Sequence, residues 1–194
     1  MSTVDADRRR SDATRNREAI LSAGFEVLSR KPDAGLTEVA RLSGLTRTTV
    51  YAHFASREEL LAELLRRAVE HATRAIDASN PAQGPAEVAL HRVLTASWQQ
   101  VAHHAQLTEA IGHILGERAA ELHAPVELRL SELVSRGRRE GAFRDDVPVP
   151  WLLTVYFALV HAAGRQVANG ASTASDAERS LLATLLAAFG APAR

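Results

Sequence analysis

A stretch of seven residues contains five side chains that can bind nucleic acid, namely Arg47, Thr48, Thr49, Tyr51 and His53. An Arg side chain can pair with the edge of guanine, and a Thr methyl group can contact thymine. Hydroxyl, ring N–H and guanidinium groups also bind phosphate oxygens. No Asp or Glu interrupts the stretch. A helix with these residues on its exposed side therefore suits a groove lined with phosphates and base edges.

Two short helices joined by a tight turn, within residues 36–54, are the elements that position these side chains. We expect Thr37 to cap the first helix, because its hydroxyl can accept from the free N–H groups of the opening turn. Gly44 lies in the break and tolerates the positive φ that a sharp turn demands. The inner side of the first helix is expected to carry Val39, Ala40 and Leu42.

The second helix has its own cap and its own inner side. Thr46 can cap it, and Val50 and Phe54, four residues apart, lie on one face. Ala40, Gly44 and Val50 have the spacing of a helix-turn-helix, in which a small residue lets the helices approach, glycine turns and valine fills the junction. An ordinary helical hairpin with a polar exposed side is the alternative interpretation.

The residues around this stretch resemble the DNA-binding domain of the TetR family of bacterial transcriptional regulators. The resemblance covers about residues 15–65, the first third of the chain, and is specific there. Where the family often has Lys after the Tyr-x-His-Phe motif, this sequence has Arg57, which keeps the charge. The residues that resemble the family are Ala19-Ile20, Ala23, Phe25, Val39-Ala40, Gly44-Leu45-Thr46, residues 49–54 and residues 57–61.

The resemblance implies a role for each matching side chain. Base-edge contact is expected from Arg47, Thr48 and Thr49, at the start of the second helix. The remaining residues are expected to bind phosphates and set the docking angle: Thr37, Tyr51, His53 and Arg57. Packing against the neighbouring helices is the alternative for Tyr51.

The N-terminal residues 1–12 are polar and are expected to form a flexible arm. Arg8, Arg9 and Arg10 could reach into the adjoining minor groove, as arms of some helix-turn-helix proteins do. A solvated tail is the alternative, since Asp residues offset the charge. Residues 13–57 then form the helix-turn-helix domain, whose first helix is expected from residue 13 to residue 29.

Composition favours an all-α protein. The chain has 194 residues, 46% of them hydrophobic, with only 5% aromatic residues and no cysteine. Abundant Ala and Leu favour helix over sheet. The formal net charge is zero, so the positive charge that nucleic acid requires must be local. About nine helices are expected, three of them in the N-terminal domain.

Residues 58–194 are expected to form a larger helical domain for ligand binding and dimerisation. Ser56 and Glu59 form a capping box at the start of a helix expected over residues 58–78. Its apolar stripe is too long for three short helices to cover, so its far end must pack on a second domain. Pro125 is expected to kink or interrupt a later helix, and Ser175 and Glu178 are expected to cap the last one.

The last two helices are apolar on more than one side, which exceeds what one small subunit easily buries. We therefore expect a two-fold interface, a four-helix bundle from two subunits. A wholly internal pair of helices is the alternative. The interface is predicted at Leu152, Val155, Leu159, Leu181, Leu182, Leu185 and Phe189.

By resemblance alone, the second domain is expected to hold a cavity for an unknown small-molecule effector. Large or polar residues on otherwise apolar helices are the candidates for its lining. They are Trp98, Val101, His104, Ile111, Leu115, Tyr156 and His161.

Several classes of function are disfavoured. No Gly-x-Ser-x-Gly, His-Glu-x-x-His or phosphate-binding glycine loop occurs, so an enzyme is not expected. The adjacent pair His103-His104 points about 100° apart on a helix, so we expect neither a metal nor another cofactor. No apolar run approaches the ~18 residues of a membrane span, and no secretory signal is present, which favours a cytoplasmic protein.

The sequence thus predicts a ligand-responsive regulator, most simply a repressor. It would bind a palindromic operator in double-stranded DNA as a homodimer and be released by a small molecule. The alternative is a helical protein-interaction module without DNA binding.

Overall fold

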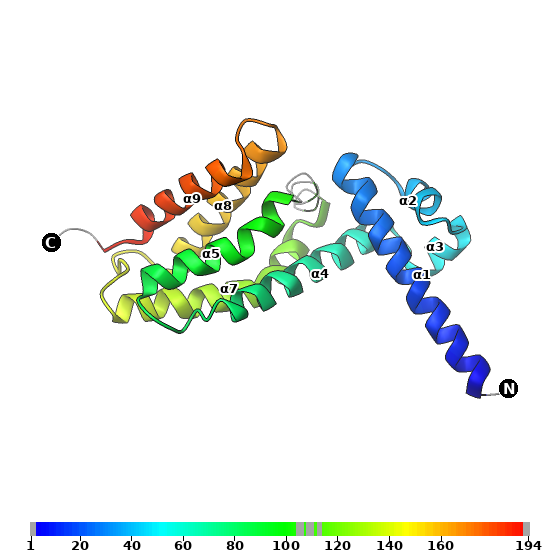
Figure 1. The fold of residues 1–194 in the computed structure, drawn as a ribbon, viewed down its shortest axis with the longest axis horizontal. Coiled ribbons are helices and arrows are strands. Elements are labelled where there is room, and N and C mark those ends of the chain that lie inside the picture. Colours follow the sequence, from blue (N-terminus) through cyan, green and yellow to red (C-terminus); the bar gives the residue numbers. More distant parts are fainter. Residues whose placement is uncertain (1–2, 104–106, 108–110, 112–113, 192–194) are drawn as a thin grey trace.

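The computed structural model describes residues 3–103, 107, 111 and 114–191, and the side chains of residues 3–6, 9 and 103 lie outside this description. Figure 1 shows two helical bodies joined by one long helix, with the two termini at opposite ends. The helices are α1 (Thr3–Arg30), α2 (Leu36–Ser43), α3 (Arg47–His53), α4 (Arg57–Ala78), α5 (Ala86–His103), α7 (Glu117–Arg139), α8 (Val149–Ala168) and α9 (Ala174–Phe189).

The all-α prediction, with an N-terminal helix-turn-helix, is confirmed. Eight helices are named within the described ranges, and the further short helix expected near residues 107–115 falls mostly outside them. Strand pairing in these ranges is limited to an isolated bridge between Phe143 and Gly190. None of the helices in the described part of the chain is both long and apolar enough to cross a membrane.

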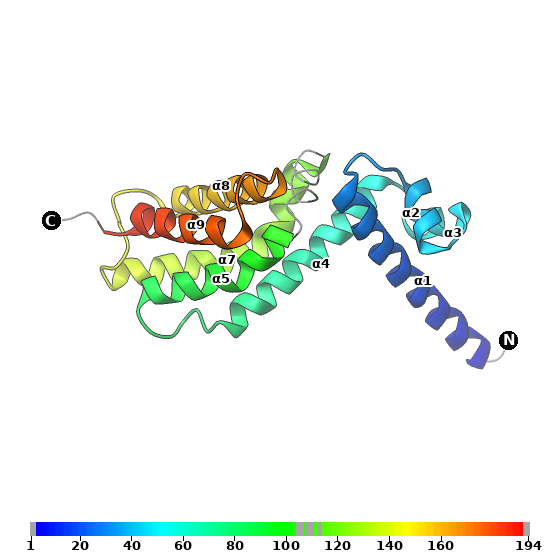
Figure 2. The ribbon, with the colours of Figure 1, turned by 45° about the horizontal axis from the view of Figure 1, so that its top comes forward.

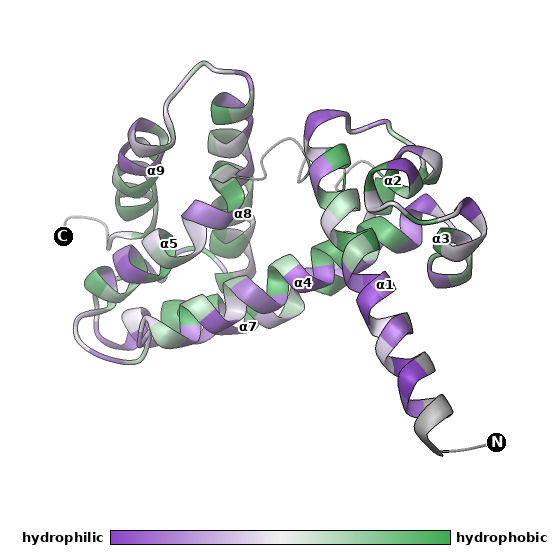
Figure 3. Cartoon of the chain, turned by 45° about the vertical axis from the view of Figure 1, so that its right-hand side comes forward, coloured by the Kyte–Doolittle hydropathy of each residue, from purple (hydrophilic) through white to green (hydrophobic). Residues whose placement is uncertain are grey.

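The expectation of a flexible arm is wrong for residues 3–12, because α1 begins at Thr3 instead of residue 13. Ala and Arg in this segment favour helix, and acidic residues near a helix N-terminus complement the macrodipole. Asp12 and Arg15 form an i,i+3 ion pair of 3.6 Å. This part of α1 is hydrophilic and projects away from the rest of the molecule (Figure 3).

Helices α1, α2 and α3 enclose a small core. Ile20, Leu28, Val39, Val50 and Phe54 are all buried there, as the apolar spacing predicts. Gly44 ends α2 with φ 70°, the left-handed conformation expected for the turn. Val50 is completely buried at the junction, so one side of α3 is held against the core and the opposite side is left outward.

Helix α4 connects the two bodies (Figure 2). The predicted capping box forms, since Ser56 Oγ accepts from the Glu59 N–H at 3.2 Å and Glu59 accepts from the Ala55 N–H at 3.0 Å. Leu60, near the start of α4, is buried close to Gly24 of α1, while Ile76, near its end, is buried in the C-terminal body. The far end of the apolar stripe of α4 thus packs against the C-terminal helices, where a second domain is expected.

Helices α4, α5, α7, α8 and α9 pack together in the C-terminal body. The loop between α4 and α5 is held by two arginines. Arg92 donates to the carbonyls of residues 79, 80 and 83, and Arg136 donates to those of residues 81 and 84. The close approach of Phe143 to Gly137 leaves no room for a Cβ, which would lie 2.2 Å from the Phe143 ring.

Two helix boundaries differ from the sequence prediction. Helix α7 runs through Pro125 from Glu117 to Arg139 without a new start. The cap of α9 is Thr173, whose hydroxyl accepts from the Asp176 N–H at 3.1 Å, and not Ser175. Both Ser and Thr can cap, so the choice depends on which residue has extended backbone, and Thr173 does (ψ 156°).

Candidate nucleic-acid interface and internal cavity

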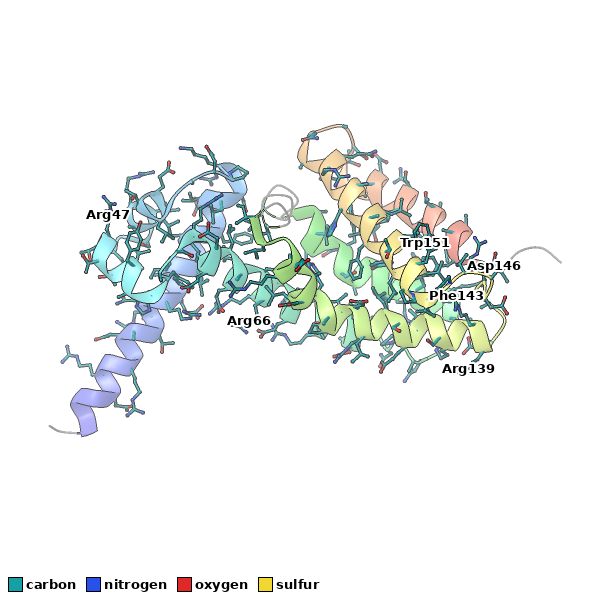
Figure 4. All side chains as sticks on the ribbon, turned by 180° about the vertical axis from the view of Figure 1, so that it is seen from behind. Arg47, Arg66, Arg139, Phe143, Asp146 and Trp151 are labelled. Carbon is teal, nitrogen blue, oxygen red and sulfur yellow. The ribbon has the colours of Figure 1, made fainter. Side chains whose placement is uncertain are left out.

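The outward side of α3 has the side chains predicted for it. Thr46 caps the helix by accepting from the Thr49 N–H at 3.1 Å, as expected. Arg47, Thr48 and Tyr51 are exposed, Tyr51 to 47% of its side chain. Figure 4 shows Arg47 at the outer edge of the N-terminal body, pointing away from the other helices. These three side chains form one free surface, which we call the α3 face.

Two further residues of α3 are less free than the sequence suggested. The Thr49 hydroxyl lies 2.8 Å from the Thr46 hydroxyl and completes the cap. His53 is half-buried and lines a hollow between the two bodies together with Arg17, Phe54 and Glu63. The geometry thus favours positioning roles over the base contact predicted for Thr49 and the phosphate contact predicted for His53.

The two predictions made for the ends of α2 are wrong. Thr37 makes no cap, because α2 begins at Leu36 with Gly35 as its N-cap residue, and the Thr37 side chain is exposed in the first turn. Leu42 is 40% exposed and not inside. The last turn of so short a helix extends beyond the core that α1 and α3 supply. Thr37 keeps a position from which it can bind a phosphate.

Arg57 is engaged inside the N-terminal body. It is half-buried, and its guanidinium donates to the Pro32 carbonyl in the loop between α1 and α2. This contact fixes the loop against the start of α4. We therefore assign Arg57 a structural position, contrary to the predicted phosphate contact.

The N-terminal arginines lie on a helix and not on a flexible arm. Arg8 and Arg10 are exposed, and the Arg9 side chain lies outside the described atoms. Adjacent residues of a helix point about 100° apart. Arg8 and Arg10, two positions apart, therefore point to different sides of the helix in this conformation.

An ionic cluster joins α1 to α4 beside the α3 face. Glu63 lies 3.2 Å from Arg17 and 2.6 Å from Arg66, and Arg67 pairs with Glu18 of α1 at 2.6 Å. The hydrogen bond from Arg66 and the charge of Arg17 lower the pKa of Glu63 to about 2. Arg66 lies where α4 leaves the N-terminal body (Figure 4). The sequence reasoning did not find this cluster, because it requires the pairing of α1 with α4.

An internal cavity of about 100 Å³ lies in the C-terminal body. Four helices contribute its walls: α4, α5, α7 and α8. It is lined by Leu65, Ala68, Val69, Ala72, Ser97, Gln100, Val101, His123, Val126, Tyr156, Phe157, Val160 and His161.

The cavity contains part of the predicted lining. Val101, Tyr156 and His161 are there, whereas Ile111 and Leu115 are buried outside this lining and His104 lies outside the described residues. Trp98 is a core residue whose Nε1 donates to the Ala174 carbonyl at 2.9 Å, so its predicted place in this cavity is wrong. The sequence missed His123 and Phe157, whose orientation depends on how α7 and α8 pack.

The predicted dimer face divides into two groups. Leu152, Leu181, Leu185 and Phe189 are buried within the subunit, Leu185 and Phe189 completely, so their assignment to an interface is wrong. They fill the core that α8 and α9 share with their neighbours. The predicted residues that keep a partly exposed surface are Val155, Leu159 and Leu182. The largest exposed apolar side chain of α8 is Trp151, 58% exposed, which the sequence prediction omitted.

Comparison with known proteins agrees with this architecture. Residues 20–64 match the family model described as bacterial regulatory proteins, tetR family. The transcriptional repressor LfrR of Mycolicibacterium smegmatis is 29% identical over 160 residues, which cover 80% of this chain and 81% of LfrR. The uncharacterized transcriptional regulator YxbF of Bacillus subtilis is 33% identical over 109 residues, 52% of this chain and 29% of YxbF.

Solved structures share the fold over most of its length. LfrR in complex with proflavine has a TM-score of 0.72 at 24% identity, covering 90% of this chain and 96% of that one. FadR from Bacillus subtilis in complex with stearoyl-CoA has a TM-score of 0.75 at 16% identity, covering 88% and 98%.

The helix-turn-helix, its exposed α3 face and the attached helical domain together have the architecture of a DNA-binding transcriptional regulator. More particularly, residues 20–64 match the tetR family of bacterial regulatory proteins, and the chain is similar to the TetR-like repressor LfrR over most of its length.

Proposed function

We propose that this protein is a repressor that binds a palindromic operator as a homodimer and leaves it when a small molecule occupies the internal cavity. The repressor assignment follows LfrR, a named transcriptional repressor. Effector binding is supported by the structures of LfrR with proflavine and of FadR with stearoyl-CoA. The single observation that supports DNA reading best is the α3 face.

The roles at the operator follow from exposure and chemistry. Arg47 is placed to pair with guanine in the major groove, and Thr48 is placed beside it to contact a thymine methyl group. Tyr51, one turn further along α3, reaches a phosphate with its hydroxyl, as does Thr37 from α2. Thr49 and His53 hold α3 in place. The exposed arginines of α1, Arg8 and Arg10, offer further phosphate contacts.

Dimerisation explains how so small a reading surface gains affinity. A two-fold dimer places two α3 helices about one DNA turn, roughly 34 Å, or a little more, apart. Linking two half-sites makes the second binding event intramolecular, which multiplies the affinity. We assign the interface to the outer sides of α8 and α9, with Trp151, Val155, Leu159 and Leu182 in contact. Trp151 is on α8, at the opposite end of the molecule from Arg47 (Figure 4).

Helix α4 is the natural connection between effector and operator. Its residues Leu65, Val69 and Ala72 line the cavity, while Glu63 and Arg67 of the same helix bind α1. A ligand that displaces the wall formed by α4 therefore also displaces the helix-turn-helix. Such a ligand acts only through the difference in its affinity for the two conformations.

Selection from a pool of random duplexes tests the regulator proposal directly. We expect the full-length protein to enrich a sequence with two-fold symmetry, and its affinity to fall steeply as salt rises, because phosphate contacts release counterions. Failure to enrich any sequence would overturn the proposal. Binding that is insensitive to salt and to DNA sequence would favour the alternative of a protein-interaction module.

A further inference from the structure

Among the described residues, the lining of the internal cavity is polar in places but includes no Asp, Glu, Lys or Arg. Its hydrogen-bonding side chains come from α5, α7 and α8. They are Ser97, Gln100, His123, Tyr156 and His161. A charged ligand atom placed there would lose its hydration without an opposite charge to replace it, which is costly. The composition of the lining therefore bears on which class of molecule it accepts.

Two titratable groups of the lining, Tyr156 and His161, have pKa values shifted toward their uncharged forms. Burial raises the pKa of Tyr156 to about 12, so its hydroxyl stays protonated. Burial lowers the pKa of His161, and the neighbouring His123 and Arg165 lower it further. His123 Nδ1 lies 2.6 Å from the Ala119 carbonyl, which can only accept, so Nδ1 carries a proton.

A second, more open hollow of about 490 Å³ adjoins the cavity between α7 and α8. The two hollows share His123, Phe157 and His161. The cavity alone is smaller than the ~300–1,000 Å³ of a typical small-molecule site, but the two together fall within this range. The outer hollow alone already reaches this range, so a ligand of ordinary size that enters the cavity must also occupy the outer hollow, beside the shared side chains.

The shared side chains form a cluster of rings in edge-to-face contact. The centroid of His123 lies 5.9 Å from that of Phe157 and 6.2 Å from that of His161, and Tyr156 lies 5.6 Å from Phe157. A ligand with a flat aromatic ring can insert into this cluster and make edge-to-face contacts of the same kind. Within the part of the chain that the structure describes, the only carboxylate that lines either hollow is Glu127, at the outer one, and it is exposed, so water screens its charge.

We infer that the effector is an uncharged aromatic molecule with at least one hydrogen-bonding atom, which enters between α7 and α8 and inserts beside His123, Phe157 and His161. This inference rests on the proposed function, in which the cavity controls DNA binding. It goes beyond that function by setting the chemical class of the ligand. By this reasoning the cavity prefers a neutral ligand over a cation such as proflavine, which is named with the structure of LfrR.

A pair of fluorescent probes with the same ring skeleton tests the inference. Acridine is uncharged at about pH 7.5, whereas proflavine is a diamino-acridine and a cation at that pH. In titrations of the full-length protein we expect acridine to bind at least about tenfold more tightly than proflavine. Equal or tighter binding of proflavine, or no binding of acridine, would overturn the inference.

Two matched variants locate the binding. Gln100→Glu adds a carboxylate to the cavity with little change in shape, and it should raise the affinity for proflavine several-fold. Gln99→Glu makes the same change on the exposed side of α5 and should leave both affinities unchanged. Equal responses of the two variants would show binding elsewhere.

A third variant controls for occupancy, and a separate assay isolates the proposed function. Val101→Phe fills the cavity and should lower the affinity for acridine at least about tenfold, while the helical content of the protein stays the same. Unchanged acridine binding by a folded Val101→Phe protein would count against the inference. Operator selection by the unliganded protein reports on DNA binding alone, so failure of the probe experiment and failure of the regulator proposal give different results.

Discussion

Arg47 and Thr46 show how adjacent residues divide two tasks on the same helix. Thr46 accepts from the Thr49 N–H and fixes where α3 begins, while Arg47, the first helical residue, is exposed. Because the cap fixes the backbone at the start of α3, it also fixes the direction in which the side chain of the next residue, Arg47, leaves the helix. The two residues therefore predict separable effects, one on stability and one on DNA recognition.

Arg47→Ala should weaken operator binding by about 1–3 kcal/mol and relax preference at one base pair of each half-site, because a bidentate pair to guanine is lost. Competition binding with operator duplexes substituted at each position measures this. Arg74→Ala removes an exposed Arg from α4 in the other body and should bind like wild type. A uniform loss over all sequences would instead assign Arg47 to a phosphate.

Thr46→Ala should lower the free energy of unfolding by about 1 kcal/mol, since the Thr49 N–H loses its acceptor. Urea unfolding followed by circular dichroism measures the loss. Thr48→Ala removes a hydroxyl two residues further along α3, which forms no cap. This variant should have a free energy of unfolding close to that of wild type. A Thr46→Ala protein as stable as wild type would show that water replaces the cap at no cost.

The stability contributed by the ion pairs between α1 and α4 depends on pH, mainly through Glu63. Its pKa in the folded protein is about 2, below the ordinary 4.5, because Arg66 and Arg17 stabilise the charged carboxylate. The resulting stability is present above about pH 4.5 and is lost as the pH falls toward about 2. We expect this ion pairing to contribute about 2 kcal/mol to the free energy of unfolding, a value that includes the reduction by solvent screening of the arginines.

Comparison of wild type with Glu63→Gln tests this dependence. The free energy of unfolding of wild type should fall more steeply than that of Glu63→Gln as the pH is lowered from about 5 to about 2.5. Glu121→Gln, an exposed position on α7, should follow wild type. Parallel curves for all three proteins would show that the cluster adds no stability.

The outer side of α8 is the proposed dimer interface, so a charge placed there should change the oligomeric state. Trp151→Glu should convert a dimer to monomers in sedimentation experiments, because it places a charge on the proposed interface. Leu128→Glu is the matched control, as Leu128 is 53% exposed on α7 outside that face. An unchanged dimer in Trp151→Glu would place the interface elsewhere. Leu185→Glu should unfold the subunit instead, since Leu185 is completely buried.

In the whole molecule, effector and operator meet on one helix. Because α4 lines the cavity and also binds α1, occupation of the cavity and of the operator should be coupled. Thermodynamic linkage requires the coupling to be reciprocal. If acridine lowers operator affinity by a given factor, the operator must lower acridine affinity by the same factor.

Fluorescence titrations of acridine with and without operator duplex test this linkage. We expect a reduction of about 5–150-fold in both directions, the usual range of coupling. A non-cognate duplex serves as the control and should have little effect. Acridine that binds equally well to free and operator-bound protein would separate this cavity from the control of DNA binding.

The helix-turn-helix could be predicted from the residues because its rules act between near neighbours. A cap, a glycine in the left-handed conformation and apolar residues four apart depend on a few adjacent positions. Thr46, Gly44, Val50 and Phe54 accordingly have the predicted places. The capping box at Ser56 and the long stripe of α4 were predicted by the same local reasoning.

Only the tertiary structure decided what covers each apolar face. Periodicity shows that Leu152, Leu185 and Phe189 lie on apolar sides of helices, but not whether the same subunit or a partner buries them. The cavity depends likewise on four helices that are distant in sequence, so His123 and Phe157 gave no signal. Local hydrogen bonding and backbone preference act within a few residues, whereas burial depends on which helices pack together.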